Sequence, residues 1–442
     1  MSGPSLSRRL GGPEPIEVIV AEILARVEVS RLSLRSVMED YFKQRPRLKQ
    51  ARGLARAYAT GVLRTYRIVD ELADRVLGLD PEFLPPFERN LLRALLYEAR
   101  FRDVRDERIL AIGARYGFEE MDRAALRRVR ELDVKELVRG LSPVARMAVE
   151  YSQPDWVVEY LVKLLGSRDA RRLLKAFNRE PTTWIRVNTA RISVERLESR
   201  LRRRGIIVER DEHLPFMLRV VRSEVNISRI PEYGRGLFYI QDKGSALAAH
   251  LLGGESQVVV DVTAAPGGKA SLLHQLWSSE VVALEIKRKR AMIMRKLLGR
   301  LGAWKVYTVV ADSRVAPLRG RFSKVIVDPD CSSLGRLGHS PEMRLWIKPS
   351  VIRKYAFEQR ALLKVAYDLL ERGGELVYST CTLTLEENEE NIAWALESLG
   401  MELLEARPRV GLPGLLGLRE TQRLYPHLHG TTGFFIAKLR KE

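Results

Sequence analysis

Cysteine is nearly absent from this chain, which has only Cys331 and Cys381 among its 442 residues. Two cysteines cannot form the disulfide framework of a small secreted protein, and so few thiols suit a reducing compartment. No apolar run approaches the ~18 residues that a membrane-spanning helix needs. The first residues contain Arg8-Arg9 but lack the apolar core of a secretion signal. We therefore expect a cytoplasmic protein with no membrane segment.

Metal-ligand clusters, long internal repeats and low-complexity tracts are also missing. A zinc site needs about four ligands, and histidines near the cysteines, such as His339, have no ligand spacing, so we expect no metal. Acidic residues are in deficit, because the formal net charge is +19 and the pI is about 10.0. This excess favours an anionic partner, most simply nucleic acid, although a basic protein without such a partner is the alternative.

The first 145 residues have the pattern of an all-helical domain. Apolar residues recur at helical spacing in 16–24, 57–77 and 87–99, and prolines separate the last two segments. No catalytic constellation occurs in this part of the chain. We therefore expect a helical bundle that docks or scaffolds.

Residues 146–250 change to a mixed α+β pattern. A helix is predicted over 194–204, ended by Gly205, and strands are predicted over 184–188, 206–208 and 217–221. Between 167 and 235 there are 17 basic and 9 acidic residues. We therefore expect an RNA-binding region here.

The best candidates for contacts with phosphate are arginines of this region. Four of them crowd one helix end and a fifth lies in the first strand: Arg200, Arg202, Arg203, Arg204 and Arg186. A solvated helix face is the alternative interpretation.

From residue 251 to 442, short β-rich runs alternate with helical stretches. The runs are 258–262, 281–285, 306–311, 324–328 and 375–379. This alternation predicts an α/β domain with a parallel sheet and helices on both faces. A last strand is expected over 433–439, and 402–406 can pair with it.

The first strand of this domain leads into a small-residue turn that can approach a ligand closely. The turn is not a phosphate-binding P-loop, because Thr263 and Ala270 stand where that motif needs Gly and Ser or Thr. It is not a dinucleotide G-x-G-x-x-G turn either. The candidate cofactor residues of the turn are Thr263, Ala264, Ala265, Pro266, Gly267, Gly268 and Lys269.

Acidic residues at the next strand ends strengthen this interpretation. Glu285 ends the second strand, where doubly wound folds hold a ribose, and Asp312 follows the third, where it can meet an adenine amino group. With Arg290 and Asp328 these residues predict an adenosine cofactor held without a phosphate site. S-adenosylmethionine is such a cofactor.

The two cysteines also follow strands, Cys331 after 324–328 and Cys381 after 375–379. Open α/β sheets bind ligands at the carboxyl ends of their strands. Thiols at both places, with none elsewhere, indicate a catalytic role. The alternative is that both cysteines are buried apolar residues that only pack in the core.

Several motifs in order resemble the RNA cytosine-5 methyltransferases of the NOL1/NOP2/Sun family, which includes the bacterial Fmu/Sun (RsmB-like) 16S rRNA enzyme. They are Ile185-Arg186-Val187-Asn188, Ala264-Ala265-Pro266-Gly267-Gly268-Lys269, Asp328-Pro329-Asp330-Cys331, Ser379-Thr380-Cys381 with Glu386-Glu387-Asn388-Glu389, and Gly430-Thr431-Thr432-Gly433-Phe434-Phe435. The resemblance covers about 146–440. More weakly, 15–140 is similar to the NusB-like domain that precedes Fmu-type enzymes.

The resemblance implies a class I methyltransferase (Rossmann-like) domain over 251–442, preceded by the α+β region and by a NusB-like domain over 1–145. It implies methyl transfer from S-adenosylmethionine to C5 of a cytosine in RNA, with rRNA favoured over tRNA. We expect a monomer, although no pattern in the sequence determines the oligomeric state. It assigns the nucleophile that attacks C6 to Cys381 and product release to Cys331. Asp328 would contact the cytosine, and Lys269 would approach the base or pair with Asp328.

Local sequence supports the assignment of the thiols, because Asp328 and Asp330 flank Cys331 and nearby anions raise a thiol pKa. Asp330 departs from the family, which usually has Pro there, and Thr432 stands where Asp is common. These departures motivate an alternative, an RNA-binding assembly factor with a degenerate transferase domain. A DNA cytosine methyltransferase is disfavoured, because those enzymes carry a Pro-Cys nucleophile on the fourth-strand loop.

Overall fold

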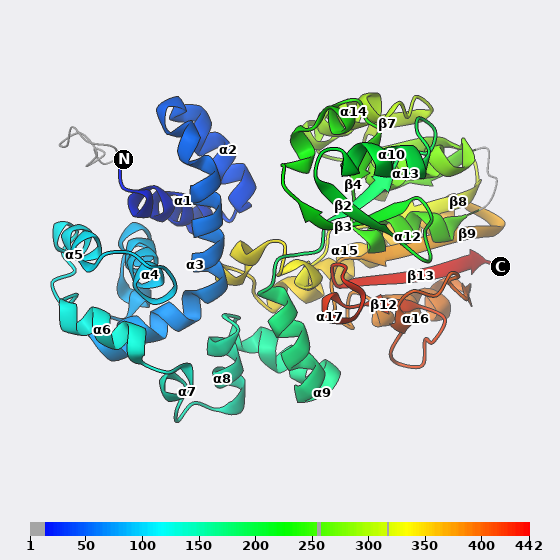
Figure 1. The fold of residues 1–442 in the computed structure, drawn as a ribbon. Helices are drawn as coiled ribbons and strands as arrows, with labels where there is room; N and C mark the ends of the chain where they lie inside the picture. The colour runs from blue at the N-terminus through cyan, green and yellow to red at the C-terminus, as the bar shows by residue number, and fades with distance from the viewer. Residues whose placement is uncertain (1–13, 254–257, 316–317) are drawn as a thin grey trace. The chain divides into compact units, whose positions relative to one another are not determined.

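The computed structural model describes residues 14–253, 258–315 and 318–442. The chain divides into two compact units, one that combines the residues up to Arg179 with Ser340–Ile347 and one that contains the rest (Figure 1). The arginine pair Arg8-Arg9, on which the expectation about secretion partly rests, lies outside the described residues.

The first unit is built from helices. Their bounds are α1 Ile16–Ser30, α2 Leu34–Gln44, α3 Arg52–Leu72, α4 Pro86–Phe101, α5 Asp106–Arg115, α6 Arg123–Glu131, α7 Val134–Leu137, α8 Pro143–Glu150 and α9 Asp155–Phe177. Helix α1 is central, because Val18 and Ala21 pack into one apolar cluster while Ile19 and Ile23 pack into another. The helices expected over 16–24, 57–77 and 87–99 are confirmed in α1, α3 with the turn that follows it, and α4.

The helical unit also takes in a short segment that follows the fourth strand of the large sheet in sequence. Arg344 is buried there and donates to the carbonyl oxygens of Ser152 (3.2 Å) and Phe177 (3.0 Å). The backbone of Leu34 donates to Glu342 at 3.2 Å. Helices α8 and α9 pack within this unit, which extends to Arg179.

The second unit contains a small antiparallel sheet with the strand order β2-β3-β1-β4. Its elements are β1 Trp184–Val187, α10 Val194–Arg202, β2 Ile206–Arg210, β3 Met217–Ser223, α11 Pro231–Gly234 and β4 Phe238–Ile240. Leu197 and Leu201 of α10 pack on Ile185 and Val187 of β1. The mixed α+β pattern expected here is confirmed.

The larger sheet of this unit has the order β11-β12-β13-β9-β8-β5-β6-β7, with β10 paired to β13. Its strands are β5 Val258–Asp261, β6 Glu280–Glu285, β7 Val306–Val310, β8 Phe322–Val327, β9 Leu370–Thr380, β10 Met401–Leu404, β11 Leu412–Pro413, β12 Gln422–Leu424 and β13 Phe434–Lys441. The five strands β5 to β9 are parallel, as the alternation predicts. Strand β13 pairs antiparallel with β9, and β10 and β12 pair antiparallel with β13, which the expectation of a parallel sheet did not include.

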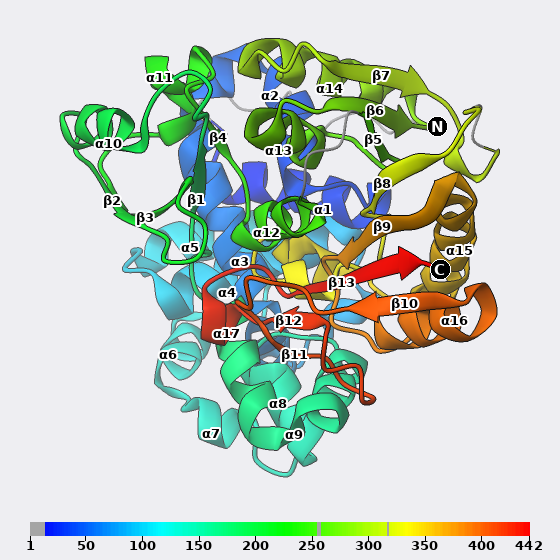
Figure 2. The same cartoon turned by 90° about the vertical axis from the view of Figure 1, so that its right-hand side faces the viewer.

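Helices cover both faces of this sheet because the side chains of each strand alternate in direction. Val259 and Ile326 face the cluster built on α12 Lys243–Leu252, α13 Gly268–Trp277 and α14 Arg288–Leu301. Val260 and Val325 face the cluster built on α15 Ser350–Leu369 and α16 Glu389–Leu399 (Figure 2). A short α17 (Pro426–His429) precedes β13. None of the described helices is long and apolar enough to cross a membrane.

Candidate active site

The turn between β5 and α13 forms the floor of the candidate site. Gly267 has φ 102°, and a Cβ on it would lie 2.9 Å from Cγ of Met294. Only glycine therefore fits both the backbone angle and the space. The turn brings the backbone from Thr263 to Gly268 to the carboxyl edge of the parallel strands, where open α/β sheets bind ligands.

Glu285 and Arg290 lie together beside this turn. The buried Glu285 accepts a hydrogen bond from the Lys287 backbone at 2.8 Å and pairs with Nε of Arg290 at 3.2 Å. Arg290 also donates to the carbonyl oxygen of Ala265 at 3.1 Å and pairs with Asp330 at 3.4 Å. One guanidinium thus ties the first and second strand ends to the loop after β8.

Asp312, after β7, is engaged by its own loop. Its carboxylate pairs with Arg314 at 2.6 Å, and hydrogen bonds from Arg314 lower the pKa of Asp312. An adenine amino group would meet an ionised acceptor here. The acidic strand ends therefore have the chemistry that an adenosine ligand needs. In the described part of the chain, no group of His, Cys, Asp and Glu side chains could hold a metal ion.

The two thiols meet although 50 residues separate them in sequence. Sγ of Cys331 lies 3.3 Å from Sγ of Cys381, and Oγ of Ser333 lies 3.4 Å from Cys381. Both cysteines are free. The hydrogen bond from Cys331, assisted by the positive charge of Arg336, lowers the pKa of Cys381 to about 7. Cys381 therefore ionises more readily than an ordinary cysteine, and more readily than Cys331.

The pKa of Cys331 is raised well above its usual value, in the direction that the sequence suggested, but the cause differs. It is raised by its interaction with Cys381, by burial and by the charge of Glu387. The flanking Asp330 pairs with Arg290 instead of acting on the thiol. The contact between the two thiols, which are distant in sequence, therefore determines that Cys381 has the lower pKa.

Asp328 occupies the centre of the site with both carboxylate oxygens engaged. Oδ2 pairs with Nζ of Lys269 at 2.5 Å, and Oδ1 accepts from Oγ of Ser379 at 2.9 Å. Nζ of Lys269 also donates to Ser245 at 3.0 Å, and the Asp328 backbone donates to Thr263 at 2.8 Å. Lys269 thus forms an ion pair with Asp328 from the start of α13.

Glu387 is a site residue to which the sequence assigned no role. It is fully buried, and its carboxylate accepts from the backbone of Ser332 (2.9 Å), from Gln359 (3.0 Å) and from Thr384 (2.9 Å). Burial raises the pKa of Glu387. Ser332 directly follows Cys331, so this carboxylate ties the two cysteine loops together. The acidic run 386–389 beside an apolar helix was the available signal.

Two further contacts join the cysteine loops. Oγ of Ser332 lies 2.6 Å from Oγ1 of Thr382, and the Gly335 backbone donates to the carbonyl of Cys381 at 3.1 Å. A Cβ on Gly335 would lie 2.0 Å from the carbonyl oxygen of Gly433, which belongs to the family motif 430–435. Close backbone approach is therefore the reason for glycine at this position.

Arg186 lies inside the protein, which corrects its predicted contact with RNA. It is 1% exposed and donates to Gln241 at 2.9 Å, to the Gly268 carbonyl at 2.6 Å and to Ser271 at 2.9 Å. A guanidinium enclosed in this way cannot reach a nucleic-acid backbone. It holds the start of α13, and therefore the cofactor turn, against the small sheet.

The arginines at the end of α10 lie on the surface of the second unit. Arg202, Arg203 and Arg204 are exposed and Arg200 is half-buried. Nε of Arg204 pairs with Glu232 at 2.7 Å. The structure thus leaves four of the five predicted phosphate-binding residues accessible to solvent.

Both departures from the family pattern have partners in this structure. Asp330 pairs with Arg290, and Thr432 bonds Asp242 through its backbone at 2.8 Å and through its hydroxyl at 3.0 Å. Neither displaces a thiol or the Lys269–Asp328 pair.

Comparison with known proteins agrees with this geometry. Residues 248–440 match the family model of the 16S rRNA methyltransferase RsmB/F, and 153–228 match the ferredoxin-like domain of RsmF/B-like methyltransferases. A probable ribosomal RNA small subunit methyltransferase B of Bacillus subtilis (strain 168) is 27% identical, over 96% of this chain and 98% of that protein.

Two further relatives come from different comparisons. A tRNA (cytosine(72)-C(5))-methyltransferase of Pyrococcus horikoshii is 39% identical, over 49% of this chain and 55% of that protein. The crystal structure of PH0851 superimposes with a TM-score of 0.80 and 27% identity, over 97% of this chain and 100% of that one. With its class I methyltransferase fold, its ferredoxin-like region and its paired thiols, the chain belongs to the RsmB/F family of methyltransferases.

Proposed function

We propose that this protein transfers a methyl group from S-adenosylmethionine to C5 of a cytosine in RNA, through a covalent bond between Cys381 and C6 of the base. The observation that carries the proposal is the pair of free thiols 3.3 Å apart at the ligand-binding edge of the sheet, of which Cys381 has the lower pKa. The family membership and the basic surface of the second unit support the same conclusion. RNA substrates are favoured over DNA because the low-pKa thiol follows the fifth parallel strand in sequence order.

The cofactor would be held by the turn from Thr263 to Lys269, by Glu285 and Arg290 and by Asp312, with Asp328 at its reactive end. These residues offer small backbone groups for close approach and carboxylates for hydroxyl and amino groups, without a phosphate-binding turn. When bound, S-adenosylmethionine supplies an electrophilic methyl group. Everything else in the reaction falls to the chain's own residues.

Cys381 begins the reaction by adding its thiolate to C6 of cytosine. The S–C6 bond forms, the C5–C6 double bond opens, and C5 becomes nucleophilic enough to accept the methyl group. Asp328 and Lys269 would face N3 and the amino group of the base, where charge changes during the addition. Their mutual pair and the bond from Ser379 fix their positions in advance.

Release requires a base for the C5 proton. After the proton leaves, its electron pair restores the C5–C6 double bond and expels the Cys381 thiolate. The largest cause of the raised Cys331 pKa is Cys381 itself. Once Cys381 is consumed as a thioether, that cause is gone and the Cys331 pKa falls, while burial and Glu387 still raise it. Cys331 would accept the C5 proton after its own thiol proton has passed to solvent. The same contact therefore activates Cys381 first and frees Cys331 afterwards.

The substrate class favoured here is rRNA, with tRNA as the second choice. The Bacillus subtilis relative, named for small-subunit rRNA, matches this chain over nearly its whole length, whereas the tRNA-modifying relative matches about half of it. The target base must leave its stack to reach Cys381, because chemistry on a base requires its extrusion.

The test is methyl transfer from labelled S-adenosylmethionine to total RNA by wild type, Cys381→Ala and Cys331→Ala, with a denaturing gel for covalent adducts. We expect no transfer with Cys381→Ala and an accumulated RNA adduct with Cys331→Ala. An adduct that forms only with Cys381→Ala would reverse the two roles. If wild type binds the cofactor but methylates neither rRNA nor tRNA, the assembly-factor alternative replaces the proposal.

A further inference from the structure

A pocket of about 500 Å³ lies at the end of α10, apart from the thiols and the cofactor turn. It is lined by Arg200, Arg203, Arg204, Glu232 and Arg235. The first three come from the C-terminal end of α10 and the loop that follows it, and the last two come from α11 and its end. Two segments about 30 residues apart in sequence thus converge on one concave surface.

The pocket has an excess of positive charge that the protein itself does not neutralise. Its single carboxylate, Glu232, is buried and pairs with Arg204 at 2.7 Å. In the described part of the chain, Arg200, Arg203 and Arg235 form no ion pair with an acidic residue. Three of the lining residues therefore bring guanidinium groups without a counter-charge from the chain, although Arg203 also donates to Oγ of Ser199 at 3.1 Å.

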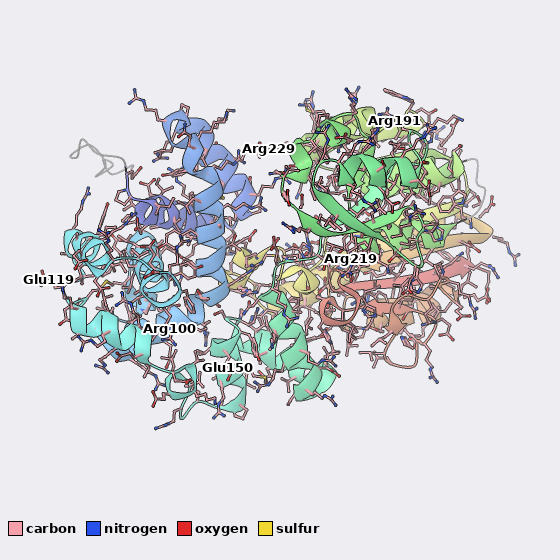
Figure 3. The ribbon with its side chains drawn as sticks, in the orientation of Figure 1. Arg100, Glu119, Glu150, Arg191, Arg219 and Arg229 are labelled. Carbon is pink, nitrogen blue, oxygen red and sulfur yellow. The ribbon has the colours of Figure 1, made fainter. Side chains whose placement is uncertain are left out.

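The backbone that carries these arginines is fixed. Helix α10 is capped by Ser193, which accepts from the Arg196 backbone at 3.3 Å, and it packs through Leu197 and Leu201. Arg191, labelled in Figure 3, donates to the carbonyl of Arg235 at 2.8 Å and to that of Arg300 at 2.8 Å. The pocket is therefore anchored from both of the segments that build it.

A helix C-terminus attracts cations through its dipole, which accounts for arginines near the end of α10. This effect falls off within the last turn and does not account for Arg235, which belongs to another element. The helix dipole also does not explain why Arg200, Arg203 and Arg204 line the pocket while the neighbouring Arg202 does not. The set of arginines that share the pocket differs from the run of arginines in the sequence.

We propose that this pocket binds one or two adjacent phosphodiester groups of the RNA substrate, away from the base that is methylated. The inference rests on the proposed function for the identity of its ligand. Guanidinium groups bind phosphate through pairs of parallel hydrogen bonds, and such contacts fix the register of a nucleic acid without reading its sequence. Arg200, Arg203 and Arg235 make the contacts, and Arg204 stays paired to Glu232 as part of the wall.

The experiment compares two variants of the full-length protein with the same change in charge on the same helix. Arg200→Glu with Arg203→Glu reverses two pocket residues, whereas Arg196→Glu with Arg202→Glu reverses two arginines that do not line the pocket. The probes are a fluorescein-labelled 20-nucleotide single-stranded RNA and a labelled 16S rRNA fragment, with fluorescence anisotropy as the readout.

We expect the Kd of the pocket variant to rise at least about tenfold and its dependence on log salt to lose about one to two units, since each lost phosphate contact removes nearly one. The matched variant should change less than about threefold. Equal weakening of the two variants would mean that only diffuse charge acts here, and would overturn the proposal. Binding unchanged in the pocket variant would overturn it as well.

Arg235→Gln provides a second test that leaves α10 intact. We expect about a threefold to tenfold weaker RNA affinity, with circular dichroism, melting temperature and affinity for S-adenosylmethionine unchanged. Methyl transfer by the pocket variant should show a raised KM for RNA with kcat retained at saturating RNA.

The two proposals fail separately. If wild type transfers no methyl group but the pocket and matched variants still differ in RNA binding, the pocket stands and the proposed function fails. If wild type methylates RNA but the two variants bind equally, the pocket alone is wrong.

Discussion

The thiol edge and the arginine pocket belong to the same compact unit but hold their reactive groups in opposite ways. At the thiol edge, Cys331, Asp328 and Glu387 each have neighbours within hydrogen-bond distance, and those contacts fix their positions. At the pocket, Arg200 and Arg235 form no ion pair among the described residues. A group that reacts must be positioned and desolvated, whereas a group that attracts phosphate needs only charge density and a fixed backbone.

The largest expected effect separates the two regions by activity. Cys381→Ser should lower turnover by at least about 10³-fold, because a serine hydroxyl is not ionised near neutral pH and cannot replace the thiolate. The same variant should bind the 20-nucleotide RNA within about twofold of wild type. Single-turnover methyl transfer and anisotropy measure the two quantities. Loss of RNA binding by this variant would show that the two regions are not functionally separate.

The second expected effect concerns stability. Glu387→Leu leaves the Ser332 backbone donor and the Gln359 amide without their acceptor in a buried place, and each such loss is worth about 1–3 kcal/mol. We expect a decrease of about 3 kcal/mol in the free energy of unfolding in urea. Glu387→Gln can keep an acceptor for these donors and should lose less than half as much.

The control on the exposed side is Arg202→Ala, which should change the free energy of unfolding by less than about 0.5 kcal/mol. A comparable loss for Arg202→Ala and Glu387→Leu would contradict the distinction between positioned and solvated groups. Because Glu387 acts through the Cys331 loop, Glu387→Gln should also shift the pH profile of Cys381 alkylation, which a purely structural role would leave unchanged.

The third prediction concerns pH. The Cys381 thiolate has a pKa of about 7, so its alkylation by iodoacetamide should rise with pH, about tenfold per unit below 7, and level off above it. In Cys331→Ala the hydrogen bond that lowers this pKa is absent, so the midpoint should move to higher pH. Mass spectrometry of the modified peptide measures the rate at each pH. An unchanged midpoint would mean that Cys331 does not activate Cys381.

The smallest expected effect tests the departure at Asp330. Its pair with Arg290 is 3.4 Å long and partly exposed, and such pairs contribute little. Asp330→Asn should weaken affinity for S-adenosylmethionine by about twofold to fivefold, because Arg290 loses one of the groups that hold it beside Ala265. Asp330→Ala also removes the carboxylate, so it should weaken the affinity for S-adenosylmethionine to a similar extent. Calorimetry would show an unchanged affinity if Asp330 is only a surface substitution.

Much of the fold followed from local patterns. Alternating apolar runs from 258 onward predicted β5 to β9 and their parallel arrangement, because strand periodicity and the intervening helices are encoded within short segments. The antiparallel turn of the sheet at β13 was not predicted, since pairing with β9 joins segments far apart in sequence. The inclusion of 340–347 in the helical unit was missed for the same reason, because only the partners of Arg344 reveal it.

The sequence by itself determined which residues carry the chemistry: two cysteines after strands, a glycine turn, acidic strand ends and an excess of arginine. Only the tertiary structure decided what surrounds them. It buried Arg186 against the cofactor turn and brought Glu387 to the Cys331 loop. It also placed Arg235 in one pocket with Arg200, whereas Arg202 does not line that pocket. The reason is physical: residue type fixes what a group can do, but its pKa, its hydrogen bonds and its access to solvent depend on neighbours that are distant in sequence.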